Sequence, residues 1–290
     1  MPKLSYGAYV FADLERLSVE ETERAYIIWQ TLANDESRFR LFNNPLSSMR
    51  RYELLRYLFE ENVNQFNVQR LTEPLKLNKF PIFIRSEDDH EASITPLLFN
   101  TKQYNDAVQT ILKNGKSRDN KIVIEYIDTR DESGFFHRFS AIVAGFQVIA
   151  IIPAHSRDWI VKELPYDSRD TNANLSRYKN HIPELIRIFR AANINYGRAD
   201  YVVLDNKIQI FEINTNPRIG PVEYLAKVAQ ILDFHSEPGH VEIIQKYSPP
   251  WKERKSKSYW AGRLLHHILR TIDKLEYEGS ILDTLKSIKK

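Results

Sequence analysis

Two acidic side chains and one amide side chain follow a pattern that suits a bound metal ion. The segment 210–220 reads IFEINTNPRIG and places Glu212 and Asn214 two residues apart within a run of strand-forming residues. Side chains two apart on a strand point to the same face of the sheet. Asp200 lies twelve residues before Glu212 and is also flanked by strand-forming residues. The three oxygen-bearing side chains are therefore candidates for one site.

A turn between two strands would bring Asp200 opposite Glu212. A three-residue turn over 205–207 makes them direct neighbours across a hairpin, and Asn206 suits such a turn because Asn tolerates left-handed backbone angles. Cross-strand neighbours have Cβ atoms about 5 Å apart, and like charges there repel. Mg2+ relieves such repulsion because it takes one or two carboxylates and leaves its other positions to phosphate and water. Mn2+ is a second option.

A second interpretation of these residues needs no metal. In it Asp200 lies at a strand edge and faces water, while Glu212 forms a salt bridge with a nearby arginine. The spacing alone does not decide between the two interpretations.

The composition excludes several classes of protein. The 290 residues are 42% hydrophobic, enough for a sizeable core in one large domain or in two to three lobes. The absence of cysteine excludes a disulfide framework, a thiolate zinc site and a cysteine nucleophile. A net charge of +3, from 41 basic and 38 acidic residues, gives no argument for nucleic acid as a partner. Without a long apolar window or a secretory signal pattern, we expect a cytoplasmic protein with no membrane partner.

Helical and strand patterns alternate along the chain. The helical periodicity predicts helices over 19–32, 47–60, 104–112 and 181–191, and from about 223 onward. Alternating and β-branched runs predict strands over 6–11, 39–42, 64–70, 80–85, 121–127, 135–143, 146–152, 199–204 and 208–214. This order places the acidic hairpin after a strand-rich middle and before a helical C-terminal part.

The hairpin resembles the catalytic hairpin of the ATP-grasp superfamily. The motifs are GRAD at 197–200 and EINTNP at 212–217, at a separation similar to that in the D-alanine–D-alanine ligase branch. The resemblance implies that the protein binds ATP and that one or two Mg2+ ions bridge its β- and γ-phosphates. The metal ligands that it implies are Asp200, Glu212 and Asn214. It also implies that Arg198 meets a tetrahedral or acyl-phosphate intermediate, where a guanidinium group spreads over two oxygens.

The resemblance implies an α+β fold, the ATP-grasp fold, in which two α+β lobes clamp the nucleotide. Residues 46–120 would form the central, phosphate-covering lobe, and 121–235 the C-terminal catalytic lobe. A small N-terminal α/β lobe over 1–45 and a helical tail over 236–290 would complete the chain.

Further residues at matching positions are expected to bind the nucleotide. Arg51 and Arg85 stand where the superfamily usually carries two phosphate-binding lysines, and arginine keeps the charge while it binds phosphate oxygens in a fork. Arg138 is a third expected phosphate contact, unless it pairs with a local carboxylate. The strand at 122–127 resembles the strand that meets adenine in the superfamily. The residues expected to contact adenine and ribose are Glu125, Tyr126, Ile127, Asp128 and Asp131.

Three other positions complete the expected site. The loop 86–93 (SEDDHEAS) is acidic where many family members carry a glycine-rich flap, so its charges must turn away and its backbone amides or His90 must cover the phosphates. His90 is otherwise an exposed loop residue. Lys162 is expected to reach the γ-phosphate. Arg218 follows the proline of the hairpin, where many ligases have glycine, and it is either an additional anion contact or a surface residue that caps the turn.

The reaction that the resemblance implies is an ATP-dependent ligation of a carboxylate with an amine or a thiol. It would pass through an acyl phosphate and release ADP and phosphate. The expected catalytic residues are Arg198, Lys162 and Arg218. The expected partners are small-molecule or peptide substrates, with a homodimer as one option for assembly. A small-molecule kinase of the same fold and a non-catalytic nucleotide-binding protein stay open as alternatives.

Overall fold

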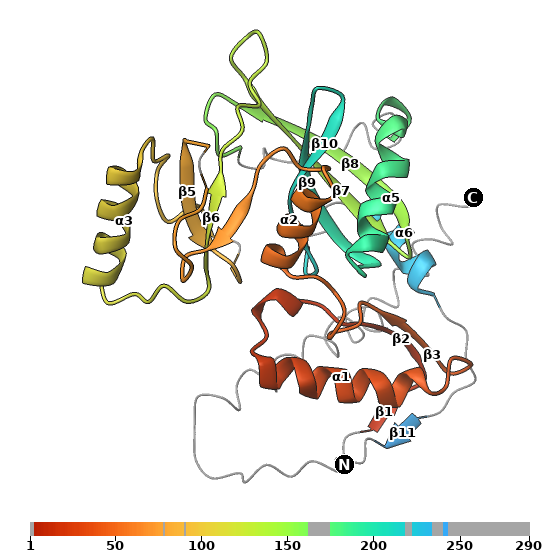
Figure 1. Ribbon diagram of the computed structural model, residues 1–290. Helices are drawn as coiled ribbons and strands as arrows, with labels where there is room; N and C mark the ends of the chain where they lie inside the picture. Colours follow the sequence, from red (N-terminus) through yellow and green to blue (C-terminus); the bar gives the residue numbers. More distant parts are fainter. Residues whose placement is uncertain are drawn as a thin grey trace. The chain divides into compact units, whose positions relative to one another are not determined.

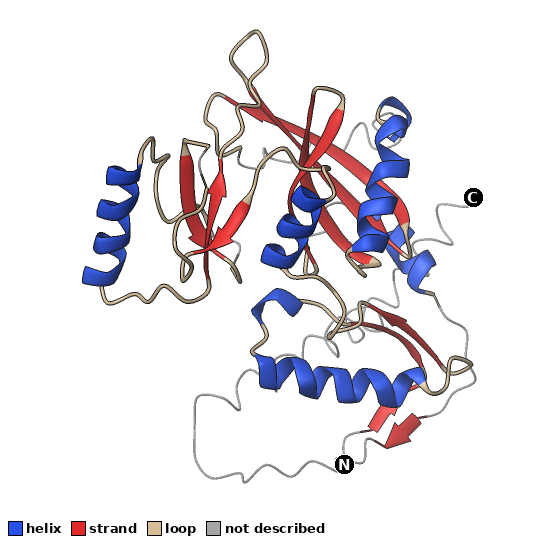
Figure 2. Cartoon of the chain, viewed as in Figure 1, coloured by secondary structure: helices blue, strands red, loops and turns tan. Residues whose placement is uncertain are grey.

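The strands of the protein are mostly antiparallel and are separated by helices, which gives the mixed α+β fold that the sequence predicts (Figures 1 and 2). The computed structural model describes residues 3–77, 79–89, 91–161, 175–217, 222–233 and 240–242. The chain divides into two units. The first comprises Met1–Ala12, Leu17–Ser47 and Ile219–Lys290, and the second comprises Asp13–Arg16 and Ser48–Arg218. Within the described ranges, no helix has the length and apolar character needed to cross a membrane.

In the first unit, a helix connects two neighbouring parallel strands. β2 (Gly7–Val10) pairs with β3 (Phe39–Phe42), and the connection includes α1 (Val19–Ala33). Parallel neighbours need such a crossover connection. α1 begins with a capping box, because the Ser18 hydroxyl accepts a hydrogen bond from the Glu21 amide and the Glu21 carboxylate accepts one from the Ser18 amide. These elements match the two strands and the helix that the sequence predicts.

The C-terminal part of the first unit departs in one place from the predicted helix. α6 (Val222–Leu232) agrees with the helix expected from about 223, but β11 (His240–Glu242) is a strand that pairs antiparallel with β1 (Lys3–Ser5). Pairing with a distant strand overrides the local pattern here, because three residues carry little helix propensity. The rest of the predicted helical tail lies outside the described residues.

The larger sheet of the second unit is antiparallel, with the strand order β10-β9-β7-β8. Its strands are β7 (Phe136–Ala144), β8 (Gln147–Ser156), β9 (Tyr196–Leu204) and β10 (Lys207–Asn214). α5 (Ile182–Ala191) follows the 3-10 helix η3 (Lys179–His181) and packs on β8, and α2 (Arg51–Glu60) packs on β10. Their shared core includes Leu54, Leu58, Leu185, Phe189, Ala199, Tyr201 and Ile210.

The smaller sheet of the second unit has the strand order β4-β6-β5. Its strands are β4 (Val68–Arg70), β5 (Ile82–Ser86) and β6 (Lys121–Glu125). One face packs against α3 (Thr101–Lys113), and the other face packs against Leu55 of α2. α2 therefore lies between the two sheets, with Leu54 and Leu58 toward the larger sheet and Leu55 toward the smaller one (Figure 1).

Two predicted elements begin later than expected. α2 starts at Arg51 rather than at 47, because Arg50 is extended (φ −80°, ψ 173°) and the Met49 amide donates a hydrogen bond to the Ala192 carbonyl at 2.9 Å. The strand predicted over 64–70 is reduced to β4. The Asn64 side chain exchanges two hydrogen bonds of 2.9 Å with the backbone of Ile210, which holds the start of this segment away from the smaller sheet.

The turn between β9 and β10 has two residues, where the sequence predicts three. Leu204 pairs with Lys207, and the turn residues Asp205 and Asn206 adopt left-handed backbone angles, with φ of 50° and 59°. This pattern is that of a type I′ turn, whose twist fits the twist of the strands. The shorter turn alone would shift the pairing by one residue from the predicted register.

A β-bulge at Phe211 compensates for the shorter turn. The register of the two strands shifts between Ile210 and Glu212. Beyond the shift, Asp200 lies opposite Glu212. The predicted pairing of the two acids is therefore confirmed, although the turn that was expected to produce it is wrong.

The bulge also decides which side chains of β10 face the apolar core. Ile208 and Ile210 pack in the core before the bulge, and Ile213 packs in it after the bulge. Regular alternation would have placed Glu212 and Asn214 on the same face as these first two residues. The bulge instead directs both polar side chains to the opposite face of the sheet.

Gly197, in the GRAD motif, allows β9 and β10 to approach closely. A Cβ atom at this position would lie 2.8 Å from the backbone oxygen of Asn214 and 3.3 Å from a methyl group of Ile213. Real Cβ atoms essentially never come so close to a backbone oxygen. The glycine is therefore required at this point of the hairpin.

We predict that Gly197→Ala lowers the free energy of unfolding by about 1–3 kcal/mol, the usual cost of overpacking, because β10 must move at Asn214. Gly115→Ala is the control, because its Cβ meets nothing within 4 Å and its φ of +71° should cost only about 1 kcal/mol. Urea unfolding of both variants measures the difference. An equal loss in the two variants would contradict the steric explanation.

Candidate functional site

Asp200 and Glu212 lie side by side on the face of the larger sheet opposite its apolar core. Asp200 is only 5% exposed, and the hydroxyl of Ser140, its neighbour on β7, donates a hydrogen bond of 2.7 Å to Asp200 Oδ1. The Glu212 side chain is 14% exposed. Burial raises the pKa of Asp200, while the guanidinium groups of Arg198 and Arg138 act in the opposite direction. The sheet therefore holds two acids at a place where their charge must be balanced by neighbours.

Two arginines bind Glu212. Arg51 Nη2 donates to Glu212 Oε2 at 2.6 Å, and Arg85 Nη2 donates to the same oxygen at 3.2 Å. Arg51 is the first residue of α2 and Arg85 lies on β5, so both contacts reach the hairpin from elements outside the larger sheet. Burial and the charge of Arg51 lower the pKa of Arg85.

Two more arginines lie against Asp200. Arg138 Nη1, from β7, donates to Asp200 Oδ2 at 3.4 Å, and Arg198 Nε, from β9, lies 3.2 Å from Asp200 Oδ1. We call Arg51, Arg85, Arg138 and Arg198 the arginine cluster. Its four positive charges face the two negative charges of the acids. Such an arrangement attracts anions, because a guanidinium group binds phosphate or carboxylate oxygens in a fork.

The predicted metal ligands do not fit a bound ion as they are arranged here. Arginines face both carboxylates, and Asn214 Oδ1 accepts a hydrogen bond of 2.7 Å from the Asn216 amide. In the part of the chain that the structure describes, no group of three or more His, Cys, Asp or Glu side chains is placed to hold a metal. Metal binding by Asp200, Glu212 and Asn214 therefore stays a prediction. The interpretation without a metal is right about the salt bridges of Glu212 and wrong about Asp200, which is buried.

Arg51 also binds the loop that follows β5. Its Nη1 donates to the backbone carbonyls of Ser86 at 2.9 Å, Glu87 at 3.2 Å and Asp89 at 2.7 Å. The sequence places Arg51 as a phosphate contact, and the structure does bring it to the acids. Its guanidinium group is, however, already bound by protein acceptors on both sides.

Three acidic side chains of this loop form contacts near the loop itself. Glu87 pairs with Arg70 at 3.0 Å, Asp88 Oδ1 accepts a hydrogen bond of 2.7 Å from the Ser86 hydroxyl, and Asp89 Oδ1 accepts one of 3.0 Å from the Glu91 amide. The loop turns backbone carbonyls, rather than the expected amides, toward the site at Arg51. His90 lies outside the described residues.

One buried and three half-buried aromatic side chains form a second cluster that the sequence analysis did not identify. The Trp159 ring makes edge contacts with Phe83, at 5.1 Å between centroids, and with Tyr126, at 6.1 Å. Phe136 of β7 packs in the same group. We call Phe83, Tyr126, Phe136 and Trp159 the aromatic cluster. Its members come from four separate segments, so no single sequence pattern reveals it.

The aromatic cluster and the arginine cluster share the same faces of two strands. On β5, Phe83 and Arg85 are two residues apart, and on β7, Phe136 and Arg138 are two residues apart. Side chains so spaced point to one face of a strand, and their backbone positions are about 7 Å apart. An elongated ligand with an aromatic ring at one end and anionic groups at the other can therefore contact both clusters.

The other expected nucleotide contacts are engaged in local interactions, except for Tyr126 and Ile127. The buried Glu125 carboxylate accepts hydrogen bonds from the amides of Asn67 at 2.9 Å and Lys79 at 3.4 Å, which gives it a structural role. Tyr126 belongs to the aromatic cluster, and burial raises its pKa to about 12. Ile127 packs against the apolar side chains between α2 and the smaller sheet.

Asp128 and Asp131 lie in the loop between β6 and β7. Asp128 pairs with Arg130, and Asp131 accepts hydrogen bonds from the Ser133 and Phe135 amides and contacts His137 Nε2 at 2.7 Å. These are contacts within the loop and the start of β7, and they do not bring either acid to the arginine cluster. Lys162 and Arg218, the other expected catalytic residues, lie outside the described residues.

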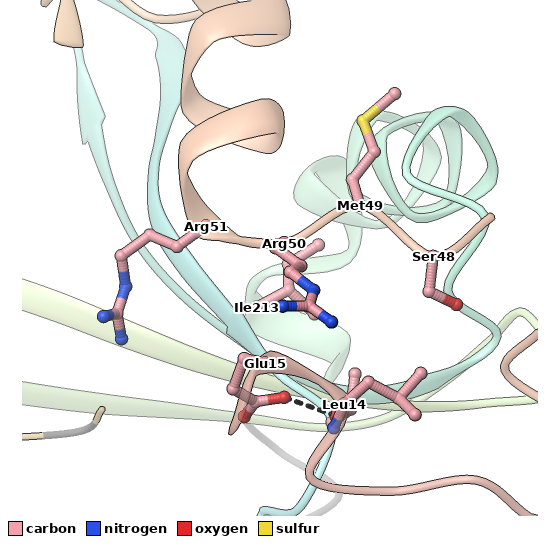
Figure 3. A pocket seen from close by; sticks show the side chains of 8 residues that line it. Leu14, Glu15, Ser48, Met49, Arg50, Arg51 and Ile213 are labelled. Carbon is pink, nitrogen blue, oxygen red and sulfur yellow. Dashed lines mark hydrogen bonds between the residues drawn. The ribbon is translucent and has the colours of Figure 1, made fainter. Parts of the chain in front are cut away.

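A small recess adjoins the hairpin on the other side of Arg51 (Figure 3). Thr215 is the fourth residue of EINTNP. Its hydroxyl oxygen accepts a hydrogen bond of 3.0 Å from the amide of Leu14, in the 3-10 helix η1 (Leu14–Arg16), and its hydroxyl donates one of 2.6 Å to the buried Glu15. In Figure 3 the Arg51 guanidinium group lies at the left of the view, apart from Glu15. The recess measures about 10 Å³, enough for one water at most, so it is not a substrate site in this form.

No family model matches the sequence, and no curated protein sequence matches it. Solved structures similar to the chain include the D-alanine–D-alanine ligase from Bacillus anthracis complexed with ATP (18% identity, 69% of this chain and 67% of that chain, TM-score 0.43). Another is phosphoribosylglycinamide synthetase from Anaerococcus prevotii (16% identity, 76% of this chain and 62% of that chain, TM-score 0.43). A third is the RimK domain protein ATP-grasp from Sphaerobacter thermophilus DSM 20745 (14% identity, 72% of this chain and 77% of that chain, TM-score 0.43).

The chain thus spans about two thirds or less of the length of the first two proteins. With identities of 14–18% and TM-scores of 0.43, these similarities do not establish the family or the activity of this chain.

We predict that the arginine cluster binds pyrophosphate in the absence of divalent metal. Arg85→Gln should weaken binding about tenfold, because one charge-assisted hydrogen bond contributes about 1.5–3 kcal/mol. Isothermal titration calorimetry at low salt measures the affinity. Arg56→Gln is the control, because Arg56 is an exposed residue of α2 that pairs with Glu60. Equal weakening in both variants, or no binding by the unmodified protein, would contradict the prediction.

Proposed function

We propose that the protein is an ATP-dependent ligase that joins a carboxylate to an amine or a thiol. One observation supports the nucleotide part of this proposal above others. The aromatic cluster and the arginine cluster lie in the same order on the same faces of β5 and β7, next to the acidic pair of the hairpin. We further propose the four-part division into 1–45, 46–120, 121–235 and 236–290, with the nucleotide between the two middle parts.

In this proposal the nucleotide lies along β5 and β7. The adenine ring contacts the aromatic cluster, because aromatic side chains stack favourably on a base. The triphosphate contacts the arginine cluster, where Arg85 and Arg138 exchange part of their contact with the acids for contact with phosphate oxygens. A guanidinium group serves either partner with the same fork of donors, so the exchange keeps its hydrogen bonds satisfied.

The proposed chemistry has two steps. An oxygen of the substrate carboxylate forms a bond to the γ-phosphorus of ATP, and the bond between that phosphorus and the bridging oxygen breaks to release ADP. An amine then attacks the carbonyl carbon of the acyl phosphate, loses a proton, and displaces phosphate. Arg198 lies on the same face of β9 as Asp200, where its guanidinium group can stabilise the charge that develops in both steps.

Mg2+ or Mn2+ belongs to this proposal as a cofactor to be tested. A divalent ion at Glu212 requires that Arg51 and Arg85 give up the oxygen that they now share. No step above is routed through the ion.

A non-catalytic nucleotide-binding protein is the second candidate, and one observation favours it. Both acids of the hairpin are engaged by guanidinium groups, which leaves them less suited to hold a metal. Tight ATP binding without turnover on any mixture of acids and amines would support this candidate.

We predict that the full chain, supplied with ATP, Mg2+ and a panel of carboxylic acids and amines, releases ADP and free phosphate in equal amounts. A kinase of the same fold would instead leave the phosphate on the acceptor, so product analysis separates the two reactions. Mass spectrometry of the ligated product identifies the substrates.

We also predict that Glu212→Gln and Asp200→Asn each reduce Mg2+-dependent ATP turnover at least about a hundredfold, because each removes a charge on which phosphoryl transfer depends. Circular dichroism should show an intact fold. Glu53→Gln is the control, because Glu53 pairs with Arg70 outside the arginine cluster. Near-normal turnover in either acidic-pair variant would refute the metal assignment.

A further inference from the structure

Arg51 connects two parts of the second unit that are distant in sequence. Its side chain is 4% exposed, and its guanidinium group has acceptors on two sides. Nη1 donates to the carbonyls of Ser86, Glu87 and Asp89, and Nη2 donates to Glu212. We infer that Arg51 is a positioning residue that couples the order of the loop 86–89 to the placement of Glu212. The inference rests on the proposed function only for the role of Glu212.

The position of Arg51 is fixed by the helix that carries it. Arg51 is the first residue of α2, and Leu54, Leu55 and Leu58 of the same helix are no more than 1% exposed. These leucines pack against both sheets, so the helix cannot shift without opening a core. Arg51 therefore serves as a fixed point from which the loop and the acid are both held.

The chemistry of the contact requires arginine. A guanidinium group offers donors in a planar fork, so that one nitrogen can serve the loop while the other serves the carboxylate. A lysine would offer a single nitrogen on a flexible chain. It could keep the charge beside Glu212 or the hydrogen bonds to the loop, but not both sets of contacts at once.

The loop depends on Arg51 for hydrogen bonds to its backbone carbonyls. Three of its carbonyls, which are partly buried, converge on Arg51 Nη1, and a carbonyl shielded from water without a donor is costly. The Glu87 carboxylate pairs with Arg70, and the Asp88 carboxylate accepts a hydrogen bond from the Ser86 hydroxyl. Arg85 adds a weaker second connection, because its Nη2 contacts Glu212 at 3.2 Å and the Glu91 carbonyl at 3.5 Å.

The coupling acts in both directions. If the ordered loop favours the pair of Arg51 and Glu212, then a ligand that draws Glu212 away from Arg51 must loosen the loop by the same free energy. The loop thereby responds to whether Glu212 is bound by protein or by ligand.

Amide hydrogen exchange in the loop tests the inference without any need for turnover. The amides of Glu87 and Glu91 report on loop order, because they donate to the Asn120 carbonyl at 2.9 Å and to Asp89 Oδ1 at 3.0 Å. We expect Arg51→Lys to raise their exchange rates about tenfold and Glu212→Gln about threefold, because each weakens a charge-assisted hydrogen bond. Arg56→Gln, the exposed control on the same helix, should leave these rates unchanged.

The decisive variant is Glu212→Gln, because Glu212 lies on β10 and is bound by Arg51 and Arg85, the two residues that also bind the loop. Unchanged exchange of Glu87 and Glu91 in this variant would overturn the coupling, even if Arg51→Lys failed to fold. If the unmodified protein has no ligase activity but Glu212→Gln still exchanges faster, the proposed function is refuted and the inference stands. An active ligase with unchanged exchange would do the reverse.

Discussion

The repulsion between Asp200 and Glu212 is the constraint on which the site depends. Two acids on opposite strands of a hairpin, where neighbouring Cβ atoms are about 5 Å apart, need cations beside their carboxylates when both are largely shielded from water. The structure supplies four guanidinium groups, two for each acid. The hairpin is therefore a point at which positive side chains must gather, and this concentration of positive charge is what suits it to phosphate.

The four arginines also connect the two sheets of the second unit at the acidic hairpin. Arg138 and Arg198 come from the larger sheet, whereas Arg85 comes from the smaller sheet and Arg51 from the helix between them. Through Arg85, Glu212 of β10 thus contacts β5, whose apolar core is separate from the core of the larger sheet. Phe83 and Phe136 extend the same faces with aromatic surface, so one ligand could replace the protein's own ion pairs across both sheets.

The sequence predicts the pattern of elements and the pairing of the two acids, because alternation and spacing are local properties. The residue pattern alone does not show which cations approach them, although the resemblance to the ATP-grasp superfamily already names Arg51, Arg85, Arg138 and Arg198 as residues of the same site. Arg51 and Arg85 lie more than a hundred residues before Glu212, and only the packing of α2 and β5 brings them there. The aromatic cluster is hidden for the same reason, since Trp159 meets Phe83 only after folding. The local pattern predicts a helix at β11, because nothing near it in the sequence shows that it pairs with β1, at the opposite end of the chain.

The bulge at Phe211 restricts the length of the hairpin, because each added or removed residue changes which face of the strand a side chain takes. Ile210 and Ile213 are three residues apart, so regular alternation would place them on opposite faces. Both face the core because Phe211 is left out of the pairing. Inserting or deleting a single residue between the turn and Glu212 would exchange the two faces of the strand, and would send the carboxylate into the core and an isoleucine into the site. Descendants of this chain can therefore lengthen or shorten the ribbon only by even steps, or by acquiring a second irregularity that cancels the first.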